Sequence, residues 1–141
     1  PEDRTSTDAL VWQDAAITLN VEANVTYELT LNLIFGNIAG RNGRLKIVSP
    51  NFIYKPIVTG NVNSIADSAI IMRNTADPKP ESLGVGEEYV FQTSGYQSSY
   101  IEMRGIFIST VPDPALRLEF KTDDDGMPLV LKQYSYMKLT R

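Results

Sequence analysis

An apolar side chain stands at every second position of the stretch YELTLNLIF, residues 27–35. Because successive side chains of an extended chain point to opposite faces, a period of two collects these apolar groups on one face of a β-strand. The apolar face holds Tyr27, Leu29, Leu31, Leu33 and Phe35, and the other face is polar at Glu28, Thr30 and Asn32. A strand with one apolar face needs a second layer over that face, so the stretch predicts half of an antiparallel two-layered fold.

Similar alternation recurs along the rest of the chain. The stretches are AITLNV (16–21), RLKIV (44–48), EYVFQ (88–92), YIEMRGIFIST (100–110), LRLEFK (116–121) and LVLKQYSYMKL (129–139). Pro, Gly and Asp clusters separate them, and we interpret Pro56, residues 112–114 and residues 123–128 as parts of turns and loops. No stretch has the pattern of a capped amphipathic helix, and short strands at this spacing predict an all-β sandwich or barrel.

The length of 141 residues is that of one domain, and we expect a single β-sandwich over residues 9–141. The charged opening PEDRTSTD predicts a short N-terminal arm over residues 1–8 that orders against a partner. The segment 60–99 is rich in Asn, Ser, Gly and Pro around a short apolar patch at 69–72. We interpret this segment as one long excursion, of the kind in which binding surfaces tend to lie.

The alternation slips within the stretch 100–110. Ile101 and Met103 share one parity, whereas Ile106 and Ile108 have the other, with Gly105 between the two pairs. A β-bulge at Gly105 would bring all four side chains to one face. The alternative is a strand that is apolar on both faces, whose second face would be buried by a neighbouring subunit.

The chain contains neither histidine nor cysteine. Their absence removes the usual proton shuttle at physiological pH, disulfides, thiol nucleophiles and Cys-based metal sites. A net charge of −4 with scattered basic residues argues against a nucleic-acid partner. No apolar run is long enough for a membrane span, and the charged opening is not that of a signal peptide. We therefore expect a non-enzymatic protein with no cofactor, no metal, no nucleic acid and no membrane partner.

Carboxylates are the remaining groups with chemical potential. The acidic run 123–125 before Gly126 invites a calcium interpretation, but it lacks the ligand spacing of an EF-hand loop, and a solvated turn explains it better. Glu87 with Glu88, or Glu102 with Glu119, could form an acid and base pair, yet nothing in the sequence fixes their separation. The GVGEE stretch at 84–88 has the wrong spacing for a nucleotide-binding loop.

Several tyrosines occur in the strand-like stretches, and Tyr134 and Tyr136 share a parity with Lys132 and Lys138. Three interpretations remain open for them. They pack at the edge of the core, they make a subunit contact, or they form a platform for a carbohydrate, since exposed tyrosines serve in both kinds of interface.

Four fragments, taken in order, resemble a family of small β-sandwich virion proteins of tailed phages. They are LNVEANVTYELTLNLIFG, LKIVSP, RGIFISTVPDPALRLEFK and LKQYSYMKLTR. The positions that match the family pattern are Ala23, Asn24, Thr26, Tyr27, Gly105, Leu116, Leu118, Phe120, Ser135, Tyr136, Leu139 and Arg141. The resemblance covers the two ends of the chain and leaves residues 55–100 unmatched.

The resemblance implies an antiparallel two-sheet jelly-roll-like sandwich that is similar to trimeric tumour-necrosis-factor or C1q modules. It further implies a location on the virion. Among the functions that fit, we expect first a capsid decoration protein that assembles in the host cytoplasm and binds the major capsid protein on the virion surface as a homotrimer. The alternatives are a tail-associated receptor- or carbohydrate-binding module with a surface glycan as ligand, and a cellular adhesion module. The candidate subunit or capsid interface residues are Arg4, Trp12, Ile106, Ile108, Tyr134 and Tyr136.

Overall fold

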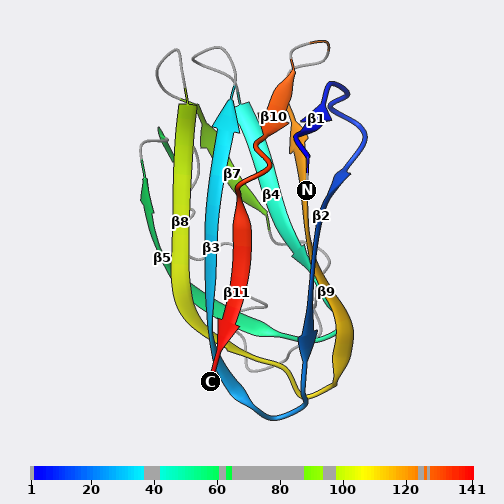
Figure 1. Ribbon diagram of the computed structural model, residues 1–141, viewed down its shortest axis with the longest axis vertical. Coiled ribbons are helices and arrows are strands. Elements are labelled where there is room, and N and C mark those ends of the chain that lie inside the picture. Colours follow the sequence, from blue (N-terminus) through cyan, green and yellow to red (C-terminus); the bar gives the residue numbers. More distant parts are fainter. Residues whose placement is uncertain are drawn as a thin grey trace.

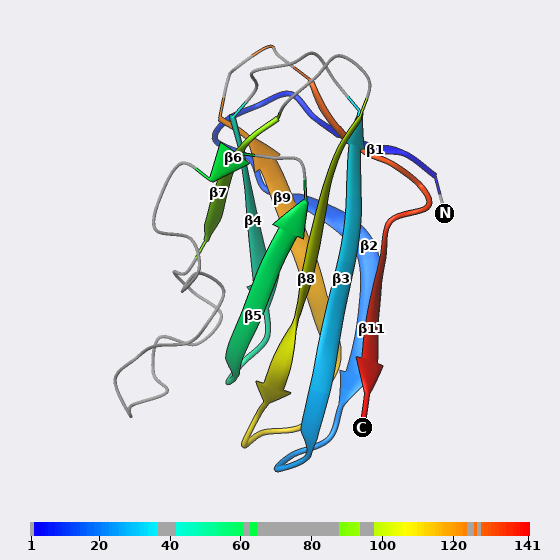
Figure 2. The same ribbon diagram turned by 90° about the vertical axis from the view of Figure 1, so that its left-hand side faces the viewer.

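Two antiparallel sheets pack face to face in the computed structural model of the protein (Figures 1 and 2). The structure describes residues 2–36, 42–60, 63–64, 88–93, 98–123, 126 and 128–141. These residues form strands, turns and bends, and no helix occurs among them. Among the same residues, accordingly, no helix has the length and apolarity that crossing a bilayer requires. The prediction of an all-β sandwich is confirmed.

Sheet A has six strands and sheet B has five. The order in sheet A is β1 (Arg4–Ser6), β10 (Leu129–Leu131), β3 (Thr26–Gly36), β8 (Ser98–Ile108) and β5 (Ile53–Gly60), and β11 (Tyr136–Thr140) also pairs with β3. The order in sheet B is β2 (Gln13–Val21), β9 (Asp113–Thr122), β4 (Asn42–Val48), β7 (Tyr89–Gln92) and β6 (Asn63–Ser64). Strands β1 to β6 alternate between the two sheets, as do β7 to β10, which is the jelly-roll-like crossing pattern.

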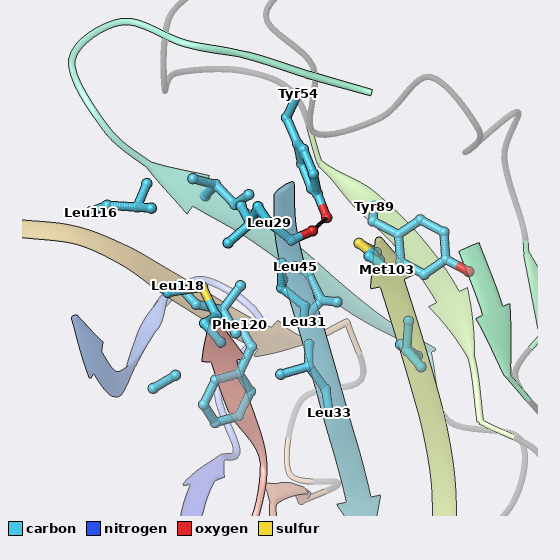
Figure 3. Close-up of a cluster of buried hydrophobic side chains, with 14 of the residues drawn as sticks. Leu29, Leu31, Leu33, Leu45, Tyr54, Tyr89, Met103, Leu116, Leu118 and Phe120 are labelled. Carbon is cyan, nitrogen blue, oxygen red and sulfur yellow. Dashed lines mark hydrogen bonds between the residues drawn. The ribbon is translucent and has the colours of Figure 1, made fainter. Parts of the chain in front are cut away.

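The core lies between the sheets, where the predicted apolar face of β3 is buried. Leu29, Leu31 and Leu33 have no solvent-exposed surface, and Figure 3 shows them directed toward side chains of sheet B such as Leu118 and Phe120. Strand β9 alternates in the same way from residue 116 onward. Leu116, Leu118 and Phe120 are fully buried, while the charged side chains between them reach the outer surface. Period-two alternation therefore identified both layers of the core.

Strand β8 does not contain the bulge that the sequence suggested at Gly105. Its register with β3 runs without a shift from Ile108 opposite Thr26 to Ser98 opposite Gly36. Ile106 and Ile108 consequently point to the outer surface, whereas Ile101, Met103 and Phe107 point inward. The prediction of a bulge is wrong, since the strand is apolar on both faces. Gly105 instead allows a close approach of β5, because a Cβ there would overlap the carbonyl oxygen of Lys55.

Part of the segment predicted as an arm belongs to the sandwich. Residues 4–6 form β1, which pairs with β10 at the edge of sheet A. Ser6 is fully buried, and its Oγ accepts a hydrogen bond of 2.9 Å from the backbone N–H of Thr122 in sheet B. The pairing relies on backbone groups of a three-residue strand, which is too short to show a side-chain period.

Two further segments differ from their predicted loop conformation. Strand β5 contains Pro56, which the sequence placed in a turn, and β9 begins at Asp113 inside the predicted loop 112–114. Proline is compatible with β5 because this strand lies at the edge of sheet A. The predicted stretch 129–139 divides into β10 and β11, and at the break the Ser135 Oγ accepts a hydrogen bond from the Ile34 N–H. The apolar patch 69–72 lies outside the described residues.

Candidate functional site

The outer surface of sheet A is formed by β5, β8, β3 and β11, which lie side by side in Figure 1. We call the outward side chains of these four strands face A. In register order they are Ile53, Lys55, Ile57 and Thr59 on β5, Ile108, Ile106, Arg104, Glu102 and Tyr100 on β8, Thr26, Glu28, Thr30, Asn32 and Ile34 on β3, and Thr140, Lys138 and Tyr136 on β11.

Four isoleucines gather on the β5 and β8 part of face A. Ile53 lies directly opposite Ile108, and Ile106 and Ile57 lie on adjacent rows of the same strand pair. Ile57 is 74% exposed and Ile106 is 53% exposed, whereas Ile53 and Ile108 are half-buried. We call these four residues the isoleucine patch. A cluster of aliphatic side chains on an outer sheet surface is typical of a contact with another protein.

Charged side chains border the isoleucine patch. The Arg104 Nε lies 3.1 Å from the Glu28 Oε1, and Lys55 stands beside Ile106 on the adjacent strand. Farther across the sheet, Lys138 is exposed on β11, and Glu102 is half-buried on β8. Face A therefore carries charges of both signs around an apolar area.

The end of face A beyond Arg104 is aromatic and polar. Tyr100 and Tyr136 are exposed there, and Tyr134 is exposed directly before β11 begins. The Asn32 Nδ2 donates a hydrogen bond of 3.4 Å to the Tyr136 hydroxyl, and the Glu102 Oε1 accepts one of 3.5 Å from a threonine on β5. We call Tyr100, Tyr134 and Tyr136 the tyrosine end.

The outer surface of sheet B differs in its denser set of ion pairs, since among the described residues face A has the single pair Arg104–Glu28. Arg44 donates hydrogen bonds of 2.8 Å and 2.9 Å to the two carboxylate oxygens of Asp123 and one of 2.8 Å to Glu88. These bonds, from Glu88 first and then Asp123, raise the pKa of Arg44. Asp123 is thus half-buried and engaged by a guanidinium directly after β9, while residues 124 and 125 lie outside the described part of the chain, so the predicted solvated turn stays a prediction.

Trp12 also lies over sheet B and is not part of face A. The Lys46 Nζ is 4.3 Å and the Lys121 Nζ is 5.0 Å from the centroid of the Trp12 ring, which are cation–π distances. Lys46 further pairs with Glu119 at 3.5 Å. The indole ring is therefore half-buried beneath two lysine side chains.

Arg4 occupies a third location, at the side where β1 and β2 face each other. It lines an open groove of about 400 Å³ together with Glu2, Ala15 and Ala16. The structure thus brings Ile106, Ile108 and Tyr136 together on face A, with Tyr134 adjacent, but separates Arg4 and Trp12 from them. Ile57, the most exposed residue of the isoleucine patch, was not predicted as a surface residue of a strand, because Pro56 led to the prediction of a turn in place of β5.

Within the described residues, no group of three His, Cys, Asp or Glu side chains is placed to hold a metal ion. Glu102 lies on the outside of sheet A and Glu119 on the outside of sheet B, so the core separates these two carboxylates. Glu87 lies outside the described residues. Burial raises the pKa of Tyr54, whose hydroxyl donates a hydrogen bond of 2.9 Å to the Leu29 carbonyl and so serves packing (Figure 3).

Comparisons of the chain with protein-family models, with curated proteins and with solved structures find no match. The similarity to phage virion proteins therefore stays a prediction from the sequence fragments. The surfaces described above are the structural basis for proposing a function.

Proposed function

We propose that the protein is a non-enzymatic structural protein of a phage virion, a capsid decoration protein that binds the major capsid protein as a homotrimer. The supporting observation is the contrast between the two outer surfaces. Face A exposes Ile57 and Ile106 to solvent, whereas the charges of sheet B pair with one another. A protein with a cluster of exposed aliphatic side chains on the outer surface of a sheet is suited to forming an assembly, and the proposal needs no reaction and no cofactor.

The physical basis of decoration is multivalency. Three identical weak contacts that are joined in one rigid body bind a capsid with an avidity about 10² to 10⁴ above that of a single contact. Each sandwich would supply one of the three contacts, and its fully buried core makes it a rigid unit within the trimer. In this proposal the protein folds in the host cytoplasm and is added to the capsid surface.

Co-sedimentation tests the proposal. Purified protein is mixed with expanded capsids of the phage whose genome carries the gene, after these capsids have been stripped of decoration protein. We expect saturable binding with three copies per site and no binding to unexpanded shells. Equal recovery of the protein with expanded capsids and with unrelated capsids would contradict the proposal.

The tyrosine end favours a second candidate, a tail-associated receptor- or carbohydrate-binding module. Exposed Tyr100 and Tyr136 could stack on sugar rings, while Asn32 and Glu102 between them offer an amide and a carboxylate for hydroxyl groups. A glycan array distinguishes the candidates. Binding of a defined glycan that Tyr136→Ala abolishes, without any binding to capsids, would replace the decoration proposal with this one.

A further inference from the structure

We infer that face A is the surface that contacts a second copy of this chain, with the isoleucine patch as the apolar part of the contact. This assignment deepens the proposed function, on which it rests for the expectation of a homo-oligomer. It predicts which of the two outer sheet surfaces is covered in the assembly, and it leaves sheet B to face outward.

The size of face A fits such a contact. Four strands at the usual spacing, with their side chains, span roughly 20 Å, and the eight residue steps between Thr26 and Ile34 span roughly 27 Å. The projected area is therefore roughly 500 Å², which is of the same order as the roughly 800 Å² per partner of a standard interface. A second globular copy is large enough to cover this area in one contact.

The charges of face A also favour a second copy as the occupant. Lys55, Arg104 and Lys138 are positive, while Glu28 and Glu102 are negative, so the two signs nearly balance. A partner of one sign would leave half of these groups without counter-charges at the interface, which is costly. A second copy carries charges of both signs and can therefore provide counter-charges for both.

The edges of the two sheets give an independent reason for a contact through a face. Strand β5, at one edge of sheet A, contains Pro56, which lacks a backbone N–H. Strand β2, at one edge of sheet B, is interrupted by a bulge between Asp14 and Thr18, where Ala16 has a φ of 59°. Both features oppose the addition of a further strand to these edges. Two residues of the isoleucine patch, Ile53 and Ile57, lie on β5 itself, so association at this edge proceeds by packing of side chains and not by pairing of backbones.

The experiment measures molar mass by sedimentation equilibrium for the wild type, for the double variant Ile57→Asp with Ile106→Asp, and for Leu10→Asp. Leu10 is a matched control, because it is 86% exposed and lies outside face A. We expect the wild type and Leu10→Asp to have a mass that is at least twice the 15.7 kDa of a single chain. Burying a carboxylate in place of each isoleucine should raise the dissociation constant of the double variant by at least roughly 100-fold, leaving monomers.

Thermal melting of each variant checks that the fold is intact, which is expected because both isoleucines point away from the core. A wild type that stays monomeric at all concentrations, or a double variant that keeps the wild-type mass, would overturn the assignment. Capsid binding separates this outcome from the proposed function. A monomeric wild type that decorates capsids would refute the assignment of face A and the trimeric state, but not capsid decoration. An oligomer that dissociates in the face A variants, but that does not bind capsids, would refute capsid decoration and leave the assignment of face A standing.

Discussion

The substitution Leu31→Asp tests the two-layered core most directly. Leu31 is fully buried in the middle of β3, between β8 and β11 in sheet A and beneath sheet B. Removing its side chain, as in Leu31→Ala, costs about 2.7–5 kcal/mol in comparable cores. An unpaired carboxyl at the same place adds about 1–3 kcal/mol even when protonated, and more when ionised. The sum is comparable with the whole stability of an ordinary domain, about 5–15 kcal/mol.

The assay is thermal unfolding followed by circular dichroism. For a chain of 141 residues the unfolding entropy is about 0.3 kcal/mol per kelvin, so Leu31→Ala should lower the melting temperature by about 10–15 °C. Leu31→Asp should show no cooperative transition at all. The matched control is Thr30→Asp, which introduces the same group one residue earlier on the outer surface, between Arg104 and Lys138. Because Thr30 lies on face A, the comparison is made at a protein concentration at which the wild type and the control are both monomeric. There the control should melt within about 3 °C of the wild type.

The reasoning would be refuted if Leu31→Asp melted like Thr30→Asp. Such a result would mean that the odd positions of β3 are not enclosed between two sheets. A cooperative but lowered transition in Leu31→Asp, close to that of Leu31→Ala, would instead show that water reaches this layer.

Three further predictions concern the backbone and the segment before β2. Gly105→Ala should destabilise the protein by more than about 3 kcal/mol, because the new Cβ would overlap the Lys55 carbonyl, and chemical denaturation measures the loss. Asn24→Val should cost about 1–2 kcal/mol in the same assay, whereas Asn24→Gly should not, because the φ of this residue is 59°. The Gln133 N–H and then Lys132 lower the pKa of Asp3, so their stabilisation is present above the ordinary pKa of 3.8 and is lost as the pH falls through the lowered value. Hydrogen exchange of β1 should show this pH dependence in the wild type and lose it in Asp3→Asn.

The sequence predicted the elements whose two faces differ. Strands β3 and β9 are apolar on one side and polar on the other, so a simple period of two identified their inward residues. Strand β5 also alternates, with Tyr54 inward and Ile53, Lys55 and Ile57 outward. The proline at 56 hid it, because the sequence does not reveal that this strand lies at a sheet edge where proline is tolerated.

The candidate site was predictable only in part. The unusual parity of Ile106 and Ile108 was visible in the sequence, and it pointed to a second apolar face. Arg4 and Trp12 could not be placed, since their distance from face A depends on which sheet each segment joins. Trp12 is covered by Lys46 and Lys121, which come from two different strands of sheet B, and no local pattern encodes that meeting.

The pairing of the strands has a consequence for folding during synthesis. Every partner of β1, β2, β3 and β5 lies beyond residue 97 in the chain. During synthesis β3, with its apolar side, therefore emerges from the ribosome long before its partner strands β8 and β11 have been synthesised. Because such distant segments must meet before any of these ladders forms, folding should take milliseconds to seconds. Until then, the exposed apolar side chains of the nascent first half must be kept from aggregating with other nascent chains.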